Sequence, residues 1–348
     1  MFGRTGLAIN PLCLGTGMFG RPDSDRHECI RVIHKALDAG INVIDTADVY
    51  NAGEAERLVG EAIKGRRDEI IVATKFGTVL SEFPRVGGSS RRWIMRAVEA
   101  SLSRLDIDVI DVYQMHQLDD ETDAEETLGA LTTLVDQGKV LQIGHSNLLG
   151  SEIADLEWRA RQAGGVRFTS HEPPYNLMTR HIEADVLPAC RRYGLGVIAY
   201  GCLNAGWLTG RYRRGEAFPA GSRGTDPGSA HRFDQSNPNN ARKFEIVAQL
   251  ADIAAAAGLS LTHMAVAWTL HQPGITGVVL GARTCDQLAG LIAAADIRLG
   301  DDLLAAIDTV VPPGTDVNPM ETGVSRTFSP QIAAALSNRV QSTMRTHR

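Results

Sequence analysis

Four titratable side chains stand at or just after the ends of three consecutive apolar segments: Asp45, Tyr50, Lys75 and His116. Three of them can also be explained by an ordinary structural role. Asp45 could be a turn carboxylate, Tyr50 a half-buried ring and His116 a hydrogen-bonded structural histidine. Lys75 is harder to explain in that way, because lysine is almost never buried without a partner. Four such groups on successive segments are improbable as an accident, and side chains of these types can hold and transfer protons.

A repeated unit of helix, glycine and strand positions these side chains. Amphipathic segments end at Gly40, Gly138 and Gly194, and a nearly continuous apolar run follows each glycine at once. Glycine supplies the left-handed residue that ends a helix, and strands that are apolar throughout are typical of parallel sheets buried on both faces. The predicted strands are Leu12–Gly15, Val43–Thr46, Ile70–Lys75, Val109–Met115, Val140–Ser146, Arg167–His171, Val197–Tyr200 and Gly277–Gly281.

Roughly eight βα units in about 300 residues predict a single-domain α/β fold, the (β/α)8 or TIM barrel. A doubly wound open sheet is the alternative. We rank it lower because GTGMFG at 15–20 lacks the G-x-G-x-x-G spacing and does not open a helix. In such a barrel the chemistry lies at the carboxyl ends of the strands. Besides the four groups above, those ends carry Ser146, Asn147, Glu172, Tyr200, Gly281 and Arg283.

Two segments depart from the repeat. Residues 211–240 are rich in Gly, Pro, Asn and charge, which predicts a long loop of the kind that forms lids or binding loops. We expect the barrel to occupy residues 1–311 and residues 312–348 to form a C-terminal tail that packs on or over it. A loosely docked tail is the alternative.

Composition narrows the class of protein. The chain has 348 residues and a net charge of −6, which argues against nucleic-acid or membrane partners. No apolar run approaches the ~20 residues of a membrane helix, and the N-terminus lacks a signal-peptide pattern. The 5 cysteines are scattered and form no C-x-x-C, which predicts reduced thiols and a cytoplasmic location. The sequence contains no close cluster of Cys and His residues, so it does not predict a metal site.

Three motifs carry a resemblance to a known family. DTADVYNAGEAERLVG (45–60), SRLDIDVIDVYQMH (103–116) and GKVLQIGHSN (138–147) resemble the signature stretches of the aldo-keto reductases. The resemblance extends from the N-terminal segment to GVVLGARTCDQL (277–288) and leaves out mainly 211–240 and the tail. The style of the loops is closer to the potassium-channel β-subunit-like and bacterial branches.

The resemblance implies a catalytic tetrad of Asp45, Tyr50, Lys75 and His116, and its physics can be argued separately. A carbonyl that accepts hydride must take a proton on oxygen, and a free phenol has a pKa near ~10. A lysine ammonium ~4 Å from Tyr50 favours the phenolate by up to ~4 kcal/mol at an effective dielectric of ~20. Asp45 would hold Lys75 while offsetting part of its effect. His116 would orient the carbonyl oxygen by a hydrogen bond.

The tetrad holds no nucleophile or metal ligand set, so the reducing equivalent must come from a cofactor. The resemblance implies that Ser146 and Asn147 bind a nicotinamide carboxamide and that Tyr200 stacks on the nicotinamide ring. The segment from Gly281 to Gln287 follows the last strand, where barrels often bind phosphate. Arg283 could pair with a 2′-phosphate, which favours NADPH over NADH; a solvated surface arginine is the alternative.

One residue, one loop segment and Leu291, which stands where many members have Asn to hold the adenine, depart from the family pattern. Glu172 stands where the family usually has Gln against the carboxamide; a glutamate cannot donate there, so it would bind the amide N–H₂ or act on substrate. GCLNAG (201–206) replaces the usual Ser-Pro-Leu of the phosphate loop, which leaves the backbone from Gly201 to Leu203 to meet the pyrophosphate. Trp207 follows this loop and is the aromatic residue that we expect to line the substrate site with Tyr50 and His116.

The sequence therefore predicts NADPH-dependent reduction of an aldehyde or ketone, with a small-molecule carbonyl as partner. An enoyl reductase on the same barrel is one alternative, which His116 disfavours because that chemistry is favoured by a carboxylic acid at this position. A nicotinamide-binding, redox-sensing subunit with negligible turnover is the other. The substrate and the oligomeric state are left open.

Overall fold

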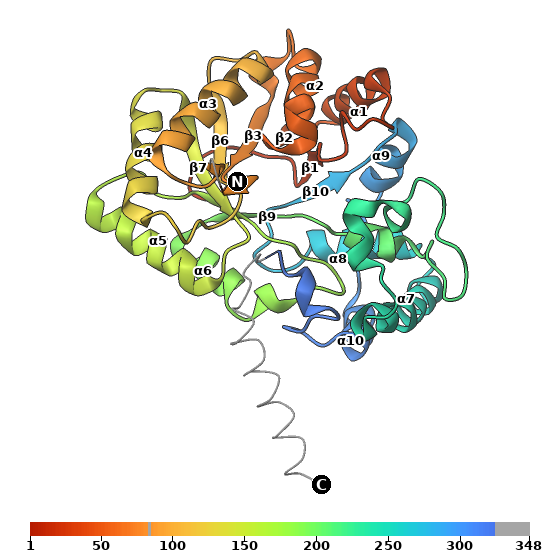
Figure 1. Ribbon diagram of the computed structural model, residues 1–348. Coiled ribbons are helices and arrows are strands. Elements are labelled where there is room, and N and C mark those ends of the chain that lie inside the picture. The colour runs from red at the N-terminus through yellow and green to blue at the C-terminus, as the bar shows by residue number, and fades with distance from the viewer. Residues whose placement is uncertain (83–84, 324–348) are drawn as a thin grey trace, which may run out of the picture.

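Eight parallel strands close into a barrel that helices surround (Figure 1). The computed structural model describes residues 1–82 and 85–323. The barrel follows the order β1-β10-β9-β8-β7-β6-β3-β2, so neighbours in the sheet are also neighbours along the chain. Its strands are β1 (Leu12–Gly15), β2 (Val43–Asp45), β3 (Ile71–Phe76), β6 (Ile110–Met115), β7 (Val140–Ser146), β8 (Ser170–Glu172), β9 (Gly196–Ala199) and β10 (Gly277–Gly281). The (β/α)8 barrel predicted from the sequence is confirmed.

The outer layer consists of helices, and the three that were predicted to end at glycines do so. Gly40, Gly138 and Gly194 have φ of 78°, 71° and 75°, the left-handed conformation that ends a helix without a Cβ penalty. The helices are α1 (Arg26–Asp38), α2 (Glu54–Ala62), α3 (Arg91–Leu105), α4 (Ala124–Asp136), α5 (Gly150–Ala163), α6 (Val186–Tyr193), α7 (Pro238–Ala256), α8 (Leu261–Leu270), α9 (Cys285–Ile292) and α10 (Asp301–Val310). A hairpin of β4 (Ser81–Glu82) and β5 (Arg85–Val86) lies between β3 and α3.

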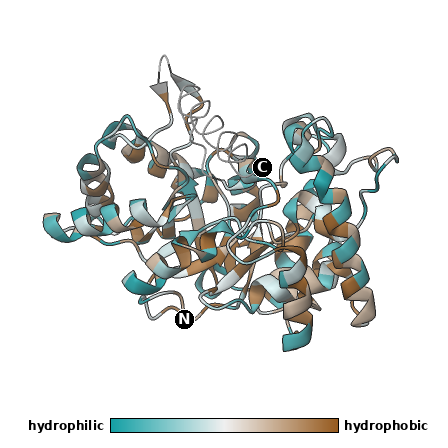
Figure 2. Ribbon diagram, turned by 90° about the horizontal axis from the view of Figure 1, so that it is seen from below, coloured by the Kyte–Doolittle hydropathy of each residue, from teal (hydrophilic) through white to brown (hydrophobic). Residues whose placement is uncertain are grey.

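The amino end of the barrel is plugged by the N-terminal segment. Phe2 is buried against Val43, Ile71 and Val112, which lie toward the amino ends of their strands. Ile9 packs beside this cluster. The N-terminus lies over the barrel axis in Figure 1 and at one end of the barrel in Figure 2. The inner core is therefore closed at this end, and any ligand must enter from the carboxyl ends of the strands.

Residues 211–240 are more structured than a long loop. They contain two short 3₁₀ helices, η5 (Arg223–Thr225) and η6 (Pro227–Arg232), and α7 already begins at Pro238. Tyr212 and Phe233 are buried, and their rings lie 5.3 Å from that of Trp207. This aromatic cluster fixes both ends of the segment to the barrel.

Residues 312–323 pack on the barrel, while residues 324–348 of the expected tail lie outside the described residues. Asp316 forms an antiparallel bridge with Thr179. Glu321 forms a fully buried ion pair with Lys243 of α7, and the Asn318 amide donates to Asn240 at 2.8 Å.

Across the described residues, no single helix is long and apolar enough to cross a membrane. The pair α7 and α8 has the required length and composition together, but it is bent by 90°.

Candidate functional site

Lys75 is the centre of the site. It is 1% exposed, forms an ion pair with Asp45 and donates to the Thr46 carbonyl oxygen at 3.2 Å. The strand register explains the pairing, because Asp45 of β2 lies opposite Ala73 of β3. Lys75 follows Ala73 by two residues, so its side chain points to the same interior face, nearer the carboxyl ends of the strands. Burying an ammonium is costly unless it is paired and hydrogen-bonded, and here both requirements are met.

Tyr50 lies directly above this ion pair. The Lys75 Nζ is 5.4 Å from the centre of the Tyr50 ring. Tyr50 opens the 3₁₀ helix η1 (Tyr50–Gly53), in which Asn51 and Ala52 have φ of 49° and 55°. Left-handed conformations cost about 1 kcal/mol or more for residues with a Cβ. The Asn51 amide offsets part of that cost by donating to the Phe19 carbonyl oxygen at 2.5 Å, which holds the loop that carries Tyr50.

His116 lies on the neighbouring strand, just after the end of β6. Its backbone N–H continues the ladder by donating to the Phe76 carbonyl oxygen at 2.8 Å, which places it at the end of β6. Its ring meets that of Tyr50 edge-on, with centroids 5.9 Å apart. Its Nδ1 lies 3.2 Å from the Thr78 hydroxyl. Burial, then the nearby Lys75, lowers the pKa of His116 to about 3, so the ring is neutral near pH 7.

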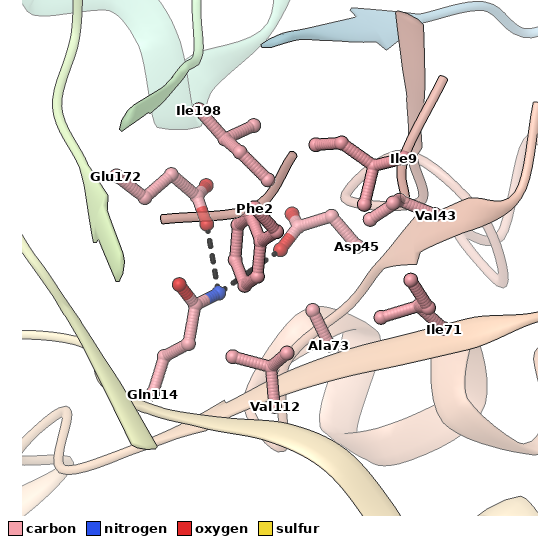
Figure 3. A pocket seen from close by; sticks show the side chains of 10 residues that line it. All are labelled: Phe2, Ile9, Val43, Asp45, Ile71, Ala73, Val112, Gln114, Glu172 and Ile198. Carbon is pink, nitrogen blue, oxygen red and sulfur yellow. Dashed lines mark hydrogen bonds between the residues drawn. The ribbon is translucent and has the colours of Figure 1, made fainter. Parts of the chain in front are cut away.

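Glu172 projects into the barrel beside Lys75. Its Oε2 lies 3.3 Å from the Lys75 Nζ and accepts from the Gln114 amide at 2.9 Å. Figure 3 shows dashed lines from the Gln114 amide nitrogen to Glu172 and to Asp45, with the Phe2 ring drawn between the two carboxylates. Both carboxylates therefore reach the same buried lysine, one from each side of the barrel.

Ser146, Asn147 and Tyr200 lie together at the ends of β7 to β9. The Ser146 hydroxyl donates to the Glu172 carbonyl oxygen at 2.6 Å. The Asn147 amide donates to the His116 carbonyl oxygen at 3.0 Å, and its Oδ1 accepts from the Tyr200 hydroxyl at 2.8 Å. Gly323 packs against this pair so closely that a Cβ there would lie 2.3 Å from the Asn147 Oδ1.

The residues predicted around the last strands form a separate, more exposed group. The spaces where side chains would stand at Gly201 and Gly281 are open, and Leu203 begins the turn that follows. Arg283 donates to the Gly221 carbonyl oxygen at 2.8 Å and forms an ion pair with Asp23 at 3.0 Å. The Gln287 side chain accepts from the Arg283 backbone N–H at 2.9 Å.

The motifs noted in the sequence extend over nearly the whole fold. The profile of the Aldo/keto reductase family matches residues 11–312. The chain belongs to the aldo/keto reductase family. It is 34% identical to the uncharacterized oxidoreductase YrpG of Bacillus subtilis, over 89% of this chain and 94% of that protein. It is likewise 34% identical to the aldo-keto reductase YhdN of the same bacterium, over 88% and 91%.

A third relative has a different name. The putative voltage-gated potassium channel subunit beta of Schizosaccharomyces pombe is 31% identical to this aldo/keto reductase, over 89% of this chain and 92% of that protein. The expected likeness to the bacterial and channel-subunit branches of the family is thereby confirmed.

The electrostatics of the site are set by burial and by the two carboxylates. Burial by itself lowers the pKa of Lys75, but attraction to Asp45 and Glu172 outweighs it, so the pKa is raised. Burial, then repulsion from Glu172, raises the pKa of Asp45 against the opposing effect of Lys75. Burial also raises the pKa of Tyr50, and Asp45 and Glu172 add to this while Lys75 opposes it. Lys75 acts on the phenol in the expected direction, but the second carboxylate weakens its effect.

Trp207 does not face the site as expected. It is fully buried, stacked on Phe233 at 5.3 Å and edge-on to Phe244 at 4.9 Å. Its ring fills the space between the β9 turn and α7, so it offers no open surface to a substrate.

Two residues of the site were not identified from the sequence. Gln114 is a buried amide among apolar residues of β6, and a buried polar side chain needs partners, which is a signal that could have found it. Thr78 follows β3 by two residues and carries no comparable signal, since its contact with His116 depends on the path of the loop. Within the described residues, no group of three or more His, Cys, Asp or Glu could hold a metal ion.

Proposed function

We propose that this aldo/keto reductase reduces an aldehyde or ketone to an alcohol and uses NADPH as cofactor. The observation that carries the proposal is the buried Asp45–Lys75 ion pair beneath Tyr50, with the neutral His116 ring 5.9 Å from the phenol ring. This arrangement has a proton donor, a cation to stabilise the anion that the donor leaves and a neutral hydrogen-bond donor. It matches the needs of a carbonyl oxygen that gains negative charge.

The residues predicted to bind the cofactor fit a nicotinamide nucleotide. Tyr200 offers an aromatic ring at a strand end, Ser146 and Asn147 offer polar groups beside it, and the open backbone at Gly201 and Gly281 leaves room for phosphates. Arg283, beside the start of α9, offers a guanidinium for a 2′-phosphate. A bound reduced nicotinamide supplies the hydride, which no side chain of the site can supply.

The side chains divide the remaining work. Tyr50 is protonated near pH 7, because its pKa is raised, and gives its proton to the carbonyl oxygen. Lys75 stabilises the phenolate that is left, and Asp45 fixes the position of Lys75. His116 is uncharged and directs a ring N–H at the carbonyl oxygen, which orients the substrate.

The test is the loss of NADPH absorbance with a reactive aromatic aldehyde, run on the wild type and on Tyr50→Phe, with NADH for comparison. We expect turnover by the wild type, a preference for NADPH, and no turnover by Tyr50→Phe with NADPH binding retained by fluorescence quenching. Turnover by Tyr50→Phe at the wild-type rate would overturn the assignment of the proton donor.

A second candidate function is supported by the relatives named as potassium channel beta subunits, at 30 and 31% identity. In that case the chain binds the nicotinamide cofactor and senses its redox state with negligible turnover. NADPH binding without turnover of any of a panel of aldehydes and ketones, together with slow cofactor exchange, favours this function over the reductase. The enoyl reductase alternative is less supported, because His116 offers no carboxylic acid.

A further inference from the structure

The Asp45–Lys75 pair has a third buried member. Glu172 is 4% exposed, and its Oε2 lies 3.3 Å from the Lys75 Nζ. The Gln114 amide links the two carboxylates, since its Nε2 lies 2.9 Å from the Glu172 Oε2 and 3.5 Å from the Asp45 Oδ1 (Figure 3). Glu172 is thus bound into the interior on the side of Lys75, rather than directed only to the cofactor residues around it.

The cluster contains one ammonium and two carboxylates. If all three were ionised, one buried negative charge would have no partner, which is costly inside a protein. Below the cluster lies a cavity of about 10 Å³, lined by Asp45, Gln114, Glu172 and apolar side chains. That volume holds one water molecule at most, so bulk solvent does not relieve the repulsion. Burial and the neighbouring Glu172 therefore disfavour the ionised form of Asp45, which raises the pKa of Asp45.

We propose that Glu172 is a positioning residue: with Asp45 it forms an acid pair that holds one proton across Lys75 and extends proton donation by Tyr50 to higher pH. The proposal rests on the proposed function, because it concerns the same phenol. Glu172 acts on Tyr50 through Lys75, and its carboxylate replaces the neutral amide that the family usually has there.

The other groups around the cluster do not compensate for this charge. Cys13 of β1 faces it from below, and burial, then Asp45 and Glu172, raises the pKa of its thiol, so it stays neutral. His116 faces it from the end of β6 and is neutral too. Tyr200 faces it from just after the end of β9, and burial raises the pKa of that phenol against the opposing effect of Arg232.

Asp48 precedes Tyr50 by two residues in the loop after β2. Burial, then Glu56, raises the pKa of Asp48 to about 7. Lys75 is the cation that lies between the two carboxylates. The charge of Asp45 and Glu172 decides how strongly Lys75 stabilises the phenolate of Tyr50.

The direction of the shift in the pH dependence of Tyr50 follows from the negative charge that Glu172 adds beside Lys75. When the pair loses its shared proton as pH rises, a second negative charge remains beside Lys75, and this keeps Tyr50 protonated. Glu172→Gln removes that charge. The basic limb of kcat/KM for carbonyl reduction should then move to lower pH by about one unit, the order that one charge supplies over several Å at an effective dielectric of ~20.

The experiment compares pH profiles of kcat/KM for wild type, Glu172→Gln, Glu172→Asp and Glu157→Gln. Glu172→Asp keeps the charge and should restore most of the wild-type basic limb. Glu157 is 2% exposed and ion-paired with Arg161 on α5, so Glu157→Gln loses a buried carboxylate outside the site and should leave the profile unmoved. An unshifted profile in Glu172→Gln, with only the cofactor Kd changed, would overturn the proposal and return Glu172 to a contact with the carboxamide.

A second readout does not need turnover. Because the pKa of Asp45 is raised in the folded state, its contribution to stability is present at low pH and is lost as pH rises through the folded pKa. The Tm of the wild type should therefore fall with rising pH more than that of Glu172→Gln, and the gap should widen as pH rises above the ordinary pKa of an aspartate.

Parallel Tm curves would contradict the shared proton. If the wild type reduces no carbonyl compound, the proposed function fails while the Tm comparison still decides on the acid pair. If Glu172→Gln does not fold, Asp45→Asn removes the other carboxylate and should flatten the Tm curve in the same way.

Discussion

The Thr78 hydroxyl lies 3.2 Å from the Nδ1 of His116, on the side of the ring that its contact with Tyr50 leaves free. A hydroxyl that donates to Nδ1 leaves the ring proton on Nε2, and the hydrogen bond made at one ring nitrogen decides which form the other presents. The contact is compatible with the tautomer of His116 that can donate to a carbonyl oxygen, in which Nδ1 accepts from the Thr78 hydroxyl.

We therefore expect Thr78→Val to lower kcat for carbonyl reduction by about fivefold, since a hydrogen bond of this kind contributes ~1 kcal/mol. NADPH affinity should not change, because Thr78 does not lie among the cofactor residues. Thr78→Ser keeps the hydroxyl and is the matched control. Equal kcat in Thr78→Val and Thr78→Ser would show that the contact has no role in orienting the ring.

Arg283 is engaged by Asp23 at 3.0 Å and by the Gly221 carbonyl oxygen at 2.8 Å. A 2′-phosphate must compete with Asp23 for the guanidinium. We expect Arg283→Leu to weaken NADPH binding by tenfold or more and to leave NADH binding nearly unchanged, because only NADPH carries that phosphate.

Asp23→Asn tests the competition from the other side. It should strengthen NADPH binding several-fold, since Arg283 loses a charged partner. Both variants are measured by quenching of protein fluorescence. Equal losses of NADPH and NADH binding in Arg283→Leu would mean that Arg283 holds the loop segment rather than the phosphate.

The fully buried Lys243–Glu321 ion pair fastens residues 312–323 to α7. Removal of one partner leaves an uncompensated buried charge, so Glu321→Gln should lower the free energy of unfolding by about 3–5 kcal/mol. Lys243→Met with Glu321→Leu replaces both charges and should cost much less.

The control is an exposed pair. Lys64 and Asp106 lie 3.0 Å apart with side chains 67% and 69% exposed, and Lys64→Gln should change the free energy of unfolding by less than about 1 kcal/mol. Urea unfolding measures all of these variants. A loss for Glu321→Gln as small as that for Lys64→Gln would show that residues 312–323 do not depend on the ion pair.

His145 of β7 and His171 of β8 lie opposite each other in the sheet, with their Nδ1 atoms 2.7 Å apart. Burial lowers the pKa of His145 to about 3, and burial followed by His145 lowers that of His171 further below its ordinary value. An unfolded histidine takes up a proton near pH ~6.5, so the stability from keeping the pair neutral is present above that pH and is lost as pH falls toward the folded pKa.

The free energy of unfolding should fall by up to ~1.4 kcal/mol per pH unit for each of these histidines below about pH 6. His171→Gln should remove one of the two contributions and give a shallower slope in urea unfolding from pH 6.5 to 4.5. An unchanged slope would mean that the pair is already charged in the folded protein.

Local patterning in the sequence determined the barrel. Gly40, Gly138 and Gly194 end helices because only glycine takes the left-handed conformation at no cost, and that requirement can be read one residue at a time. The apolar runs after them marked strands buried on both faces. The strand ends then placed Asp45, Lys75 and His116 at one end of the fold, since parallel strands share their direction.

Only the tertiary structure decided how these side chains pair. Glu172 was expected beside the cofactor, yet closure of the barrel brings its carboxylate to 3.3 Å from Lys75, which is far from it in the chain. Trp207 was expected at the site, but Phe233 of the following segment covers it. Thr78 meets His116 through the course of a loop. Such contacts depend on side-chain direction and on packing across the barrel, and neither is encoded in the spacing of residues along one strand.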